Sequence, residues 1–289
     1  MNKWKQIMEQ QTFRYIDHTE KKTFDRKPYT AMTSFALDDA LALAISNRLS
    51  PPALRTWVHD KTIVLGIPDG RLPFIEDGIK LLKSHNYNAI IRNSGGLAVA
   101  LDDGVLNLSL IIPNIKHITI QDGYEAMFDF IKYMLRDLTN RIEAYEIVGS
   151  YCPGDYDLSI DGIKFAGISQ RRIKDSAAVQ IYLDVEGNSF ERAQIIRQFY
   201  DLSIRGETTT FSYPTVLPNK MGSLSQLLDQ PLTVQDIKDR AYNALSDVNE
   251  RIITTPFSEK ELTTFEQRFK QMVKRNERIT NIYKEPSKP

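Results

Sequence analysis

The segment from residue 157 to residue 174 constrains the fold more than any other part of this sequence. Two β-like runs, residues 157–160 and 164–174, flank the dipeptide Asp161-Gly162. Asp-Gly favours the type I′ turn, in which both central residues take positive φ angles and the strands fold back on each other. The segment therefore predicts an antiparallel hairpin.

Short β-like runs and helical patterns alternate along most of the remaining chain. Further strands are expected at residues 54–58, 62–66, 89–92, 105–112, 142–148 and 177–185. Apolar side chains recur at helical spacing in residues 35–46, 75–84, 123–138 and 188–202. Ser34 is the expected N-cap of the first helix, and Asp60-Lys61 predicts a second hairpin between the first two of these strands. The pattern indicates a mixed sheet with helices on its faces.

The last third of the chain is expected to be helical. The composition changes after Pro218, and helices are predicted near Thr233 and at Ser258, the latter with Glu261 as its capping-box partner. A length of 289 residues allows one large domain or two. We therefore expect an N-terminal segment packed on a central domain, which is followed by a helical extension. Their bounds are residues 1–34, 35–218 and 219–289.

Charge and cysteine content argue against several classes of protein. Lys and Arg total 37 and Asp and Glu total 37, and this zero net charge removes the bulk attraction expected of a nucleic-acid-binding protein. No stretch approaches the roughly 18 apolar residues of a membrane helix. A single cysteine rules out an intrachain disulfide and fits a reducing compartment. We expect a soluble, cytoplasmic protein that binds neither nucleic acid nor a membrane.

The sequence carries none of the common metal or nucleotide motifs. The four histidines are scattered, and none stands at metal-ligand spacing with Cys152. A phosphate-binding loop with its lysine and a G-x-S-x-G nucleophile elbow are both missing. We expect no metal and no bound cofactor.

Cys152 lies in a turn-like segment, residues 149–155. A lone cysteine is commonly a small buried hydrophobic residue. Segments rich in Gly, Pro and Asp lie at the surface instead, and a loop of this kind at the end of a strand can present the sulfur to a substrate. Only the thiolate is a nucleophile, and an ordinary thiol has a pKa of about 8.5. If Cys152 is a nucleophile, it therefore requires a nearby base or cation.

Lys164 is the candidate for that group. It follows the Asp161-Gly162 turn, so the hairpin brings it back toward the loop that holds Cys152. Most lysines are solvated, but the neighbours of this one in the sequence are small or apolar, which favours partial burial. An ammonium group at this place would stabilise the thiolate, and a neutral amine would move protons.

Residues 92–99 are the second candidate for a functional segment, as a place where a ligand binds. Gly95-Gly96 between two expected strands would let the backbone approach a ligand closely. An ordinary hairpin turn explains the same spacing equally well. The ligand-binding interpretation gains weight only together with the Cys152 segment.

Two motifs resemble the biotin/lipoate protein ligase superfamily over roughly residues 35–202. Residues 92–99, with Leu106-Asn107-Leu108-Ser109, resemble its arginine- and glycine-rich segment. Residues 157–167 resemble its Asp-Gly hairpin with the lysine that follows.

The first motif departs from that of the ATP-dependent lipoate ligases. They carry a second arginine and a third glycine where this sequence has Asn93 and Leu97. Cys152 also stands ahead of the hairpin, and residues 149–172 look closest to the amidotransferase branch, the octanoyl-[glycine-cleavage H protein]:protein N-octanoyltransferases.

The resemblance implies an α+β fold with mixed, mostly antiparallel sheets flanked by helices and with a helical C-terminal extension. It implies that Cys152 forms an acyl-thioester and that Lys164 lowers the pKa of its thiol. The residues expected to bind the substrate, along an apolar tunnel for the octanoyl chain, are Arg92, Ser94, Gly95, Gly96 and Gly167.

The resemblance also implies the partners. The donor would be the octanoylated glycine-cleavage H protein, and the acceptor would be a lipoyl domain of an α-keto acid dehydrogenase, with the enzyme a monomer that needs no cofactor. The preference for octanoyl or lipoyl groups stays open. Two alternatives remain: octanoyl-acyl carrier protein as the donor, and a non-catalytic module that binds acylated carrier domains.

Overall fold

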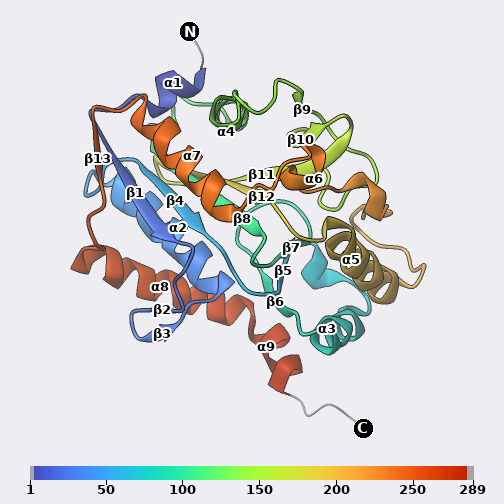
Figure 1. Ribbon diagram of the computed structural model, residues 1–289. Coiled ribbons are helices and arrows are strands. Elements are labelled where there is room, and N and C mark those ends of the chain that lie inside the picture. Colours follow the sequence, from blue (N-terminus) through green and yellow to red (C-terminus); the bar gives the residue numbers. More distant parts are fainter. Residues whose placement is uncertain (1–2, 285–289) are drawn as a thin grey trace.

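An eight-stranded sheet forms the centre of the computed structural model, which describes residues 3–284 (Figure 1). The strand order is β13-β1-β4-β8-β12-β11-β10-β9. Their bounds are β1 Thr12–His18, β4 Ala53–Trp57, β8 Val105–Pro113, β9 Ile142–Ala144, β10 Asp157–Ile160, β11 Ile163–Ile173, β12 Ser176–Asp184 and β13 Arg251–Ile253. β1 pairs in parallel with β4 and β13, and the other neighbours in this sheet pair antiparallel.

A second sheet has the order β6-β5-β7, with β5 Thr62–Leu65, β6 Asn88–Ile91 and β7 Val99–Leu101. A short ribbon joins β2 Thr23–Phe24 to β3 Lys27–Pro28. The helices are α1 Lys3–Met8, α2 Ala31–Ser46, α3 Ile75–Ser84, α4 Ile120–Met134, α5 Ser189–Ile204, α6 Leu224–Leu227, α7 Val234–Ser246, α8 Glu259–Arg275 and α9 Glu277–Lys284, with 3₁₀ turns η1 Asp69–Arg71 and η2 Pro218–Lys220. The prediction of an α+β fold with mixed, mostly antiparallel sheets is confirmed.

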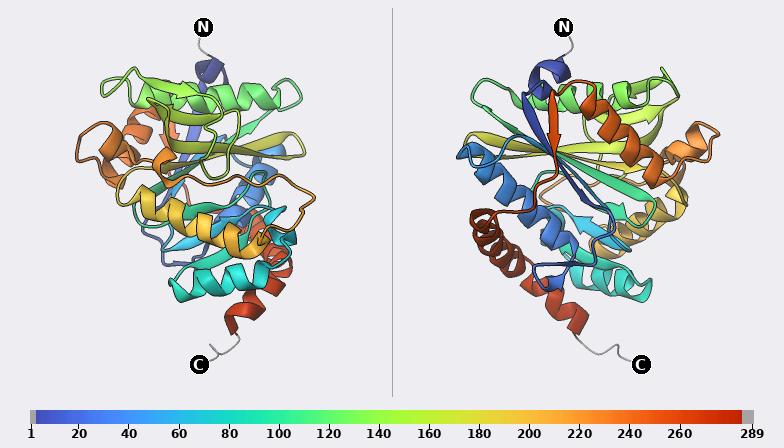
Figure 2. Two further views of the ribbon diagram at one scale, coloured as in Figure 1. Left: turned by 90° about the vertical axis from the view of Figure 1, so that its right-hand side faces the viewer. Right: turned by 60° about the vertical axis from the view of Figure 1, so that its left-hand side comes forward.

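Helices cover both faces of the large sheet (Figure 2). α1, α4 and α7 lie on one face, where Phe130 of α4 shares a core with Leu108 and Leu110 of β8. α2 lies against the opposite face, with α8 packed along its outer side. The three-stranded sheet, α3 and α5 lie on the same side as α2, so a second core separates the two sheets.

The predicted hairpin between residues 54–58 and 62–66 is wrong. β4 belongs to the large sheet and β5 to the small one, where β5 pairs with β6 and β7 instead. Every residue of both strands is buried, so neither shows the alternation that would assign it to a sheet. The short connection through Asp60 carries the chain from one sheet to the other.

The first long helix begins earlier than predicted. α2 starts at Ala31 with Thr30 as its N-cap, and the Oγ1 atom of Thr33 accepts from the Thr30 N–H group. Ser34, the predicted cap, is buried one turn inside the helix, where its hydroxyl bonds Tyr29 and His59. These contacts of Ser34 with residues outside its helix are not visible in the sequence, and they hold it inside the helix.

Both ends of the described chain contribute strands to the large sheet. β13 pairs with β1, with Thr12 opposite Arg251, and neither strand was predicted. The predicted strand at residues 142–148 is short and ends at Ala144. The capping box of Ser258 with Glu261 is confirmed at the start of α8. The three-part domain division stays a prediction. Within residues 3–284, no helix combines the length and apolar character needed to cross a bilayer.

Candidate active site

The loop between β9 and β10 holds Cys152 in a backbone conformation that L-residues rarely adopt. Its φ angle is 46°, and the turn before it contains Gly149 at φ 88°. A left-handed residue other than glycine costs about 1–2 kcal/mol, and such strain is concentrated at functional sites. The side chain is half-buried, so Cys152 is held by a surface loop and is not enclosed in the core.

Two donors point at the sulfur of Cys152. The backbone N–H of Leu97 donates to Sγ at 3.1 Å, and Nη2 of Arg92 approaches it at 3.4 Å. The same Nη2 donates to the carbonyl oxygen of Leu97 at 2.8 Å. Both groups are hydrogen-bond donors, and the guanidinium carries a positive charge. The segment of residues 92–99 and the Cys152 loop therefore meet at the sulfur.

Gly96 makes this approach possible. Its φ angle is 93°, and a Cβ atom placed on it would lie 2.3 Å from Nη2 of Arg92 and 2.9 Å from Sγ of Cys152. A side chain here would separate the two groups. Gly95 has no such constraint, since an added Cβ atom would meet nothing within 4 Å.

We expect Gly96→Ala to reduce activity by about a hundredfold, the size of effect that an ångström-scale misplacement produces. The added methyl group displaces Arg92 or Cys152, and the positive φ angle adds a stability cost of about 1–3 kcal/mol. Initial rates and chemical denaturation measure the two effects. Gly95→Ala is the matched control for stability and should unfold like the wild type; equal stability losses in both variants would contradict the steric argument.

Polar atoms of this loop remain buried without a partner. Ser94 Oγ, Asn93 Oδ1 and Arg92 Nε have no hydrogen-bond partner among the described residues. Buried polar atoms are nearly always paired in folded proteins. Their concentration in one loop beside Cys152 indicates a place where the polar part of a substrate binds.

Lys164 lies behind the Cys152 loop. Its side chain is completely buried, which is more than the partial burial that the sequence predicted. The hairpin that carries it has the predicted turn, with φ 52° at Asp161 and 75° at Gly162. Nζ of Lys164 forms an ion pair with Asp157 at 2.8 Å. Burial raises the pKa of Asp157, and the ammonium group of Lys164 opposes that rise.

The ammonium group of Lys164 holds the backbone of the cysteine loop. Nζ donates to the carbonyl oxygens of Tyr151 at 2.9 Å and Cys152 at 2.8 Å, and it also reaches Ser150 Oγ at 3.3 Å. It therefore reaches the loop through oxygen atoms, whereas Arg92 and the Leu97 N–H group contact the sulfur. Lys164 lies behind the loop as the hairpin predicted, whereas Arg92, expected only to bind substrate, is the side chain that contacts the sulfur.

A narrow cavity begins beside this centre and extends between the two sheets. Its empty volume, counted together with the open space at its mouth, is about 330 Å³. Val64, Val99 and Leu101 of the small sheet form an apolar roof. Of the predicted substrate-binding residues, two line the cavity, Arg92 and Gly167. The other three, Ser94, Gly95 and Gly96, lie outside this lining, in the loop that approaches Cys152.

Gly167 leaves room at the cavity's near end. A Cβ atom on it would lie 2.9 Å from the Tyr182 ring and 3.4 Å from Cε of Lys164. The glycine therefore keeps open the space between the ring, the lysine and the cavity.

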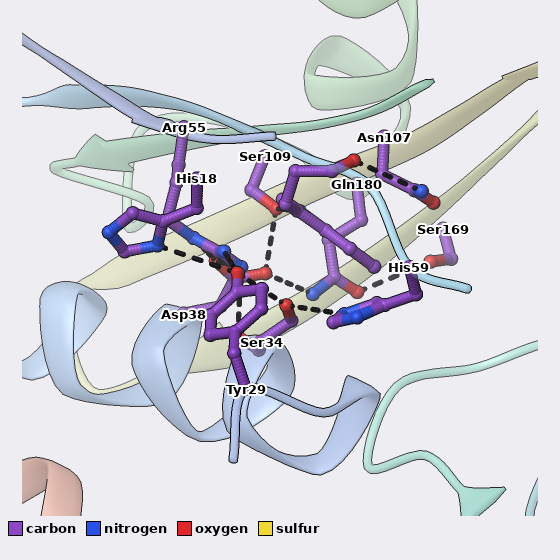
Figure 3. Close-up of polar contacts among 11 residues, drawn as sticks. His18, Tyr29, Ser34, Asp38, Arg55, His59, Asn107, Ser109, Ser169 and Gln180 are labelled. Carbon is purple, nitrogen blue, oxygen red and sulfur yellow. Dashed lines mark hydrogen bonds and ion pairs between the residues drawn. The ribbon is translucent and has the colours of Figure 1, made fainter. Parts of the chain in front are cut away.

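Polar side chains form the floor of the cavity, and they are hydrogen-bonded to one another (Figure 3). Gln180 donates from Nε2 to Asp38 at 2.6 Å, and its Oε1 faces the hydroxyl of Ser169. Asp38 also accepts from Ser109 and from Arg55, with which it forms a fully buried ion pair. Because these groups are bonded to each other, an alkyl chain can cover them without breaking their hydrogen bonds.

The sequence contained a signal for this floor. Asn107 and Ser109 interrupt the apolar run of β8, and they point to the cavity side while Leu108 and Leu110 point to the α4 side. Alternation within a strand places such residues on the face opposite the apolar ones. Gln180 gave no comparable signal.

Comparisons with a family model and with individual proteins point to the same family. The family described as "Lipoyl protein ligase A/B catalytic domain" matches residues 30–246. A protein of Oceanobacillus iheyensis named octanoyl-[GcvH]:protein N-octanoyltransferase is 59% identical over 277 residues, which cover 96% of this chain and 99% of the relative. A protein of Listeria monocytogenes named lipoyl-[GcvH]:protein N-lipoyltransferase is 43% identical and covers the same shares of the two chains.

A solved structure shares the fold. The bi-partite lipoate protein ligase of Thermoplasma acidophilum aligns with a TM-score of 0.65 at 16% identity, over 96% of this chain and 100% of that chain. At this level of identity the likeness concerns the fold alone.

Proposed function

This chain belongs to the lipoyl protein ligase A/B catalytic domain family, and from that membership we propose that it is an acyltransferase that uses a cysteine nucleophile. It transfers an octanoyl or lipoyl group from a lysine of GcvH, the glycine-cleavage H protein, to another protein. We propose a lipoyl domain of an α-keto acid dehydrogenase as the acceptor. Relatives at 43–59% identity carry names for this transfer.

The observation that carries the proposal is the placement of Cys152. Its sulfur meets the Leu97 N–H group and the Arg92 guanidinium in a loop that is backed by a buried lysine. A ligase that activates the acid with ATP requires no nucleophilic cysteine. A cysteine beside two donors fits covalent catalysis, which divides one difficult transfer into two easier steps.

The first half of the reaction is attack by the thiolate. The Cys152 sulfur adds to the amide carbonyl of acyl-lysine on GcvH, and the negative charge develops on the carbonyl oxygen. We assign the stabilisation of this oxygen to the Leu97 N–H group and Arg92, the donors that lie beside the sulfur. The C–N bond breaks, the lysine amine leaves with one added proton, and the acyl group remains on sulfur as a thioester.

The second half reverses these steps with the acceptor. A neutral lysine amine of the acceptor attacks the thioester, the C–S bond breaks, and the amine loses the proton that balances the first step. We propose that Lys164, which donates to the carbonyl oxygen of Cys152, delivers the proton in the first step and recovers it in the second. One amide replaces another, so the exchange needs no ATP. The acyl chain occupies the cavity that begins at Arg92 and Gly167.

Mass spectrometry of the acyl-enzyme tests the function. Incubation with octanoyl-GcvH and no ATP is expected to add one octanoyl group to Cys152, which a peptide digest locates. An adduct formed only from octanoyl-acyl carrier protein would contradict the donor. A requirement for ATP would contradict the transferase itself. Tight binding of octanoyl-GcvH without any adduct would instead support a non-catalytic binding module.

A further inference from the structure

Two buried residues outside the cavity and the cysteine loop hold the donors that face Cys152. We infer that Asp69 and Tyr200 are positioning residues: through two adjacent peptide groups they aim the Leu97 N–H group and Arg92 at the sulfur. This inference rests on the proposed role of Cys152 as nucleophile. Neither residue drew notice in the sequence, because each lies far from Cys152 along the chain.

The first peptide group joins Leu97 to Ala98. Its carbonyl oxygen accepts from Nη2 of Arg92 at 2.8 Å, and its N–H group donates to the hydroxyl of Tyr200 at 3.2 Å. Both ends of one rigid plane are therefore fixed. Loss of the Tyr200 bond frees this plane to rotate, and Arg92 then loses the carbonyl that holds it against Cys152.

The second peptide group joins Gly96 to Leu97. Its N–H group is the donor to the sulfur at 3.1 Å. Its carbonyl oxygen lies so close to Gly66 that a Cβ atom on Gly66 would be 1.9 Å away. The Gly66 N–H group in turn donates to Oδ2 of Asp69 at 2.7 Å.

Asp69 connects the contacts that hold these two peptide groups. Its second oxygen, Oδ1, accepts from the hydroxyl of Tyr200 at 3.0 Å. The carboxylate therefore holds the Leu97–Ala98 peptide through Tyr200 and the Gly96–Leu97 peptide through Gly66. Asp69 is completely buried and Tyr200 almost so, which fits two fixed supports better than groups that contact a substrate.

The protonation state of Asp69 follows from its surroundings. Burial raises its pKa to about 6, although hydrogen bonds from Gly66 and Tyr200 and the charge of Arg92 oppose the rise. The other titratable group facing it, Tyr213, has its pKa raised to about 12 and stays neutral. Above pH 6 the carboxylate accepts both hydrogen bonds, and below pH 6 it carries a proton and loses one acceptor site.

Acid inactivation through this group is separable from unfolding. The pKa of Asp69 is higher in the folded protein than in the unfolded chain, so folding binds a proton and acid pH strengthens its contribution to stability. Protonation of Asp69 therefore does not itself destabilise the fold.

The test is the reactivity of the Cys152 thiol toward iodoacetamide as a function of pH, a measurement that needs no acyl donor. Tyr200→Phe is expected to move the midpoint of the alkylation profile to higher pH and to lower kcat about tenfold, with KM within twofold. Tyr213→Phe is the matched control, because its hydroxyl bonds Pro68 and its ring lies against Tyr200. The control should keep the wild-type profile.

Asp69→Asn mimics the protonated carboxyl group. We expect its alkylation rate to fall below that of the wild type at pH 7.5 and to approach it below pH 6. Identical profiles for Tyr200→Phe, Tyr213→Phe and the wild type would overturn the inference, as would a constant ratio between Asp69→Asn and the wild type across pH. Because alkylation reports on the thiol alone, a failure of acyl transfer in the wild type would refute the proposed function without changing this result.

Discussion

Replacing Cys152 by serine is expected to abolish acyl transfer, with a loss of at least about a thousandfold in kcat/KM. Removal of a covalent nucleophile in other enzymes costs this much or more. A hydroxyl group remains protonated at neutral pH, and the Leu97 N–H group and Arg92 stabilise an anion that serine does not form. No acyl-enzyme should be detected by mass spectrometry.

The fold of the Cys152→Ser variant should be unchanged. The hydroxyl oxygen accepts hydrogen bonds from the same two donors, and the residue keeps its backbone position. The melting temperature and the binding of octanoyl-GcvH are therefore expected to match those of the wild type. Transfer within tenfold of the wild-type rate would show that the chemistry bypasses the sulfur and would remove the thioester step.

Local chemistry explains which elements the sequence predicted well. The Asp161-Gly162 turn adopts positive φ at both residues because the strands on either side require it. The capping box of Ser258 with Glu261 needs only residues within one helical turn. In both cases all the interacting groups lie within a few residues of one another.

Contacts between distant segments explain what the sequence did not predict. β1 and β13 come from opposite ends of the chain and pair only when the whole sheet is assembled. The contact of Arg92 with Cys152 likewise joins two loops that are remote in sequence. The resemblance to a family identified both loops as parts of a site, but it did not show that the arginine, and not the lysine, contacts the sulfur.

Replacing Lys164 by methionine is expected to lower the free energy of unfolding by about 3–5 kcal/mol, the usual cost of removing one partner from a buried ion pair. Methionine fills a similar volume but leaves the Asp157 carboxylate and the carbonyl oxygens of Tyr151 and Cys152 without their shared donor. Urea denaturation measures the loss, and activity should fall with it because the cysteine loop loses its anchor.

The pH dependence of this loss has a definite sign. Burial already raises the pKa of Asp157, and Lys164 is what opposes the rise. Without the lysine the carboxyl group of the folded variant holds its proton to still higher pH. The stability deficit of Lys164→Met is therefore largest near neutral pH and shrinks as acid protonates Asp157.

A double variant separates the structural role of Lys164 from its proposed chemical role. Lys164→Met with Asp157→Asn removes both buried charges and should recover part of the lost stability. If the ammonium group also supports the thiolate and moves protons, the double variant regains stability without regaining activity. A thiol alkylation profile that matches the wild type across pH would remove that chemical role, and recovery of full activity would make Lys164 a structural anchor only.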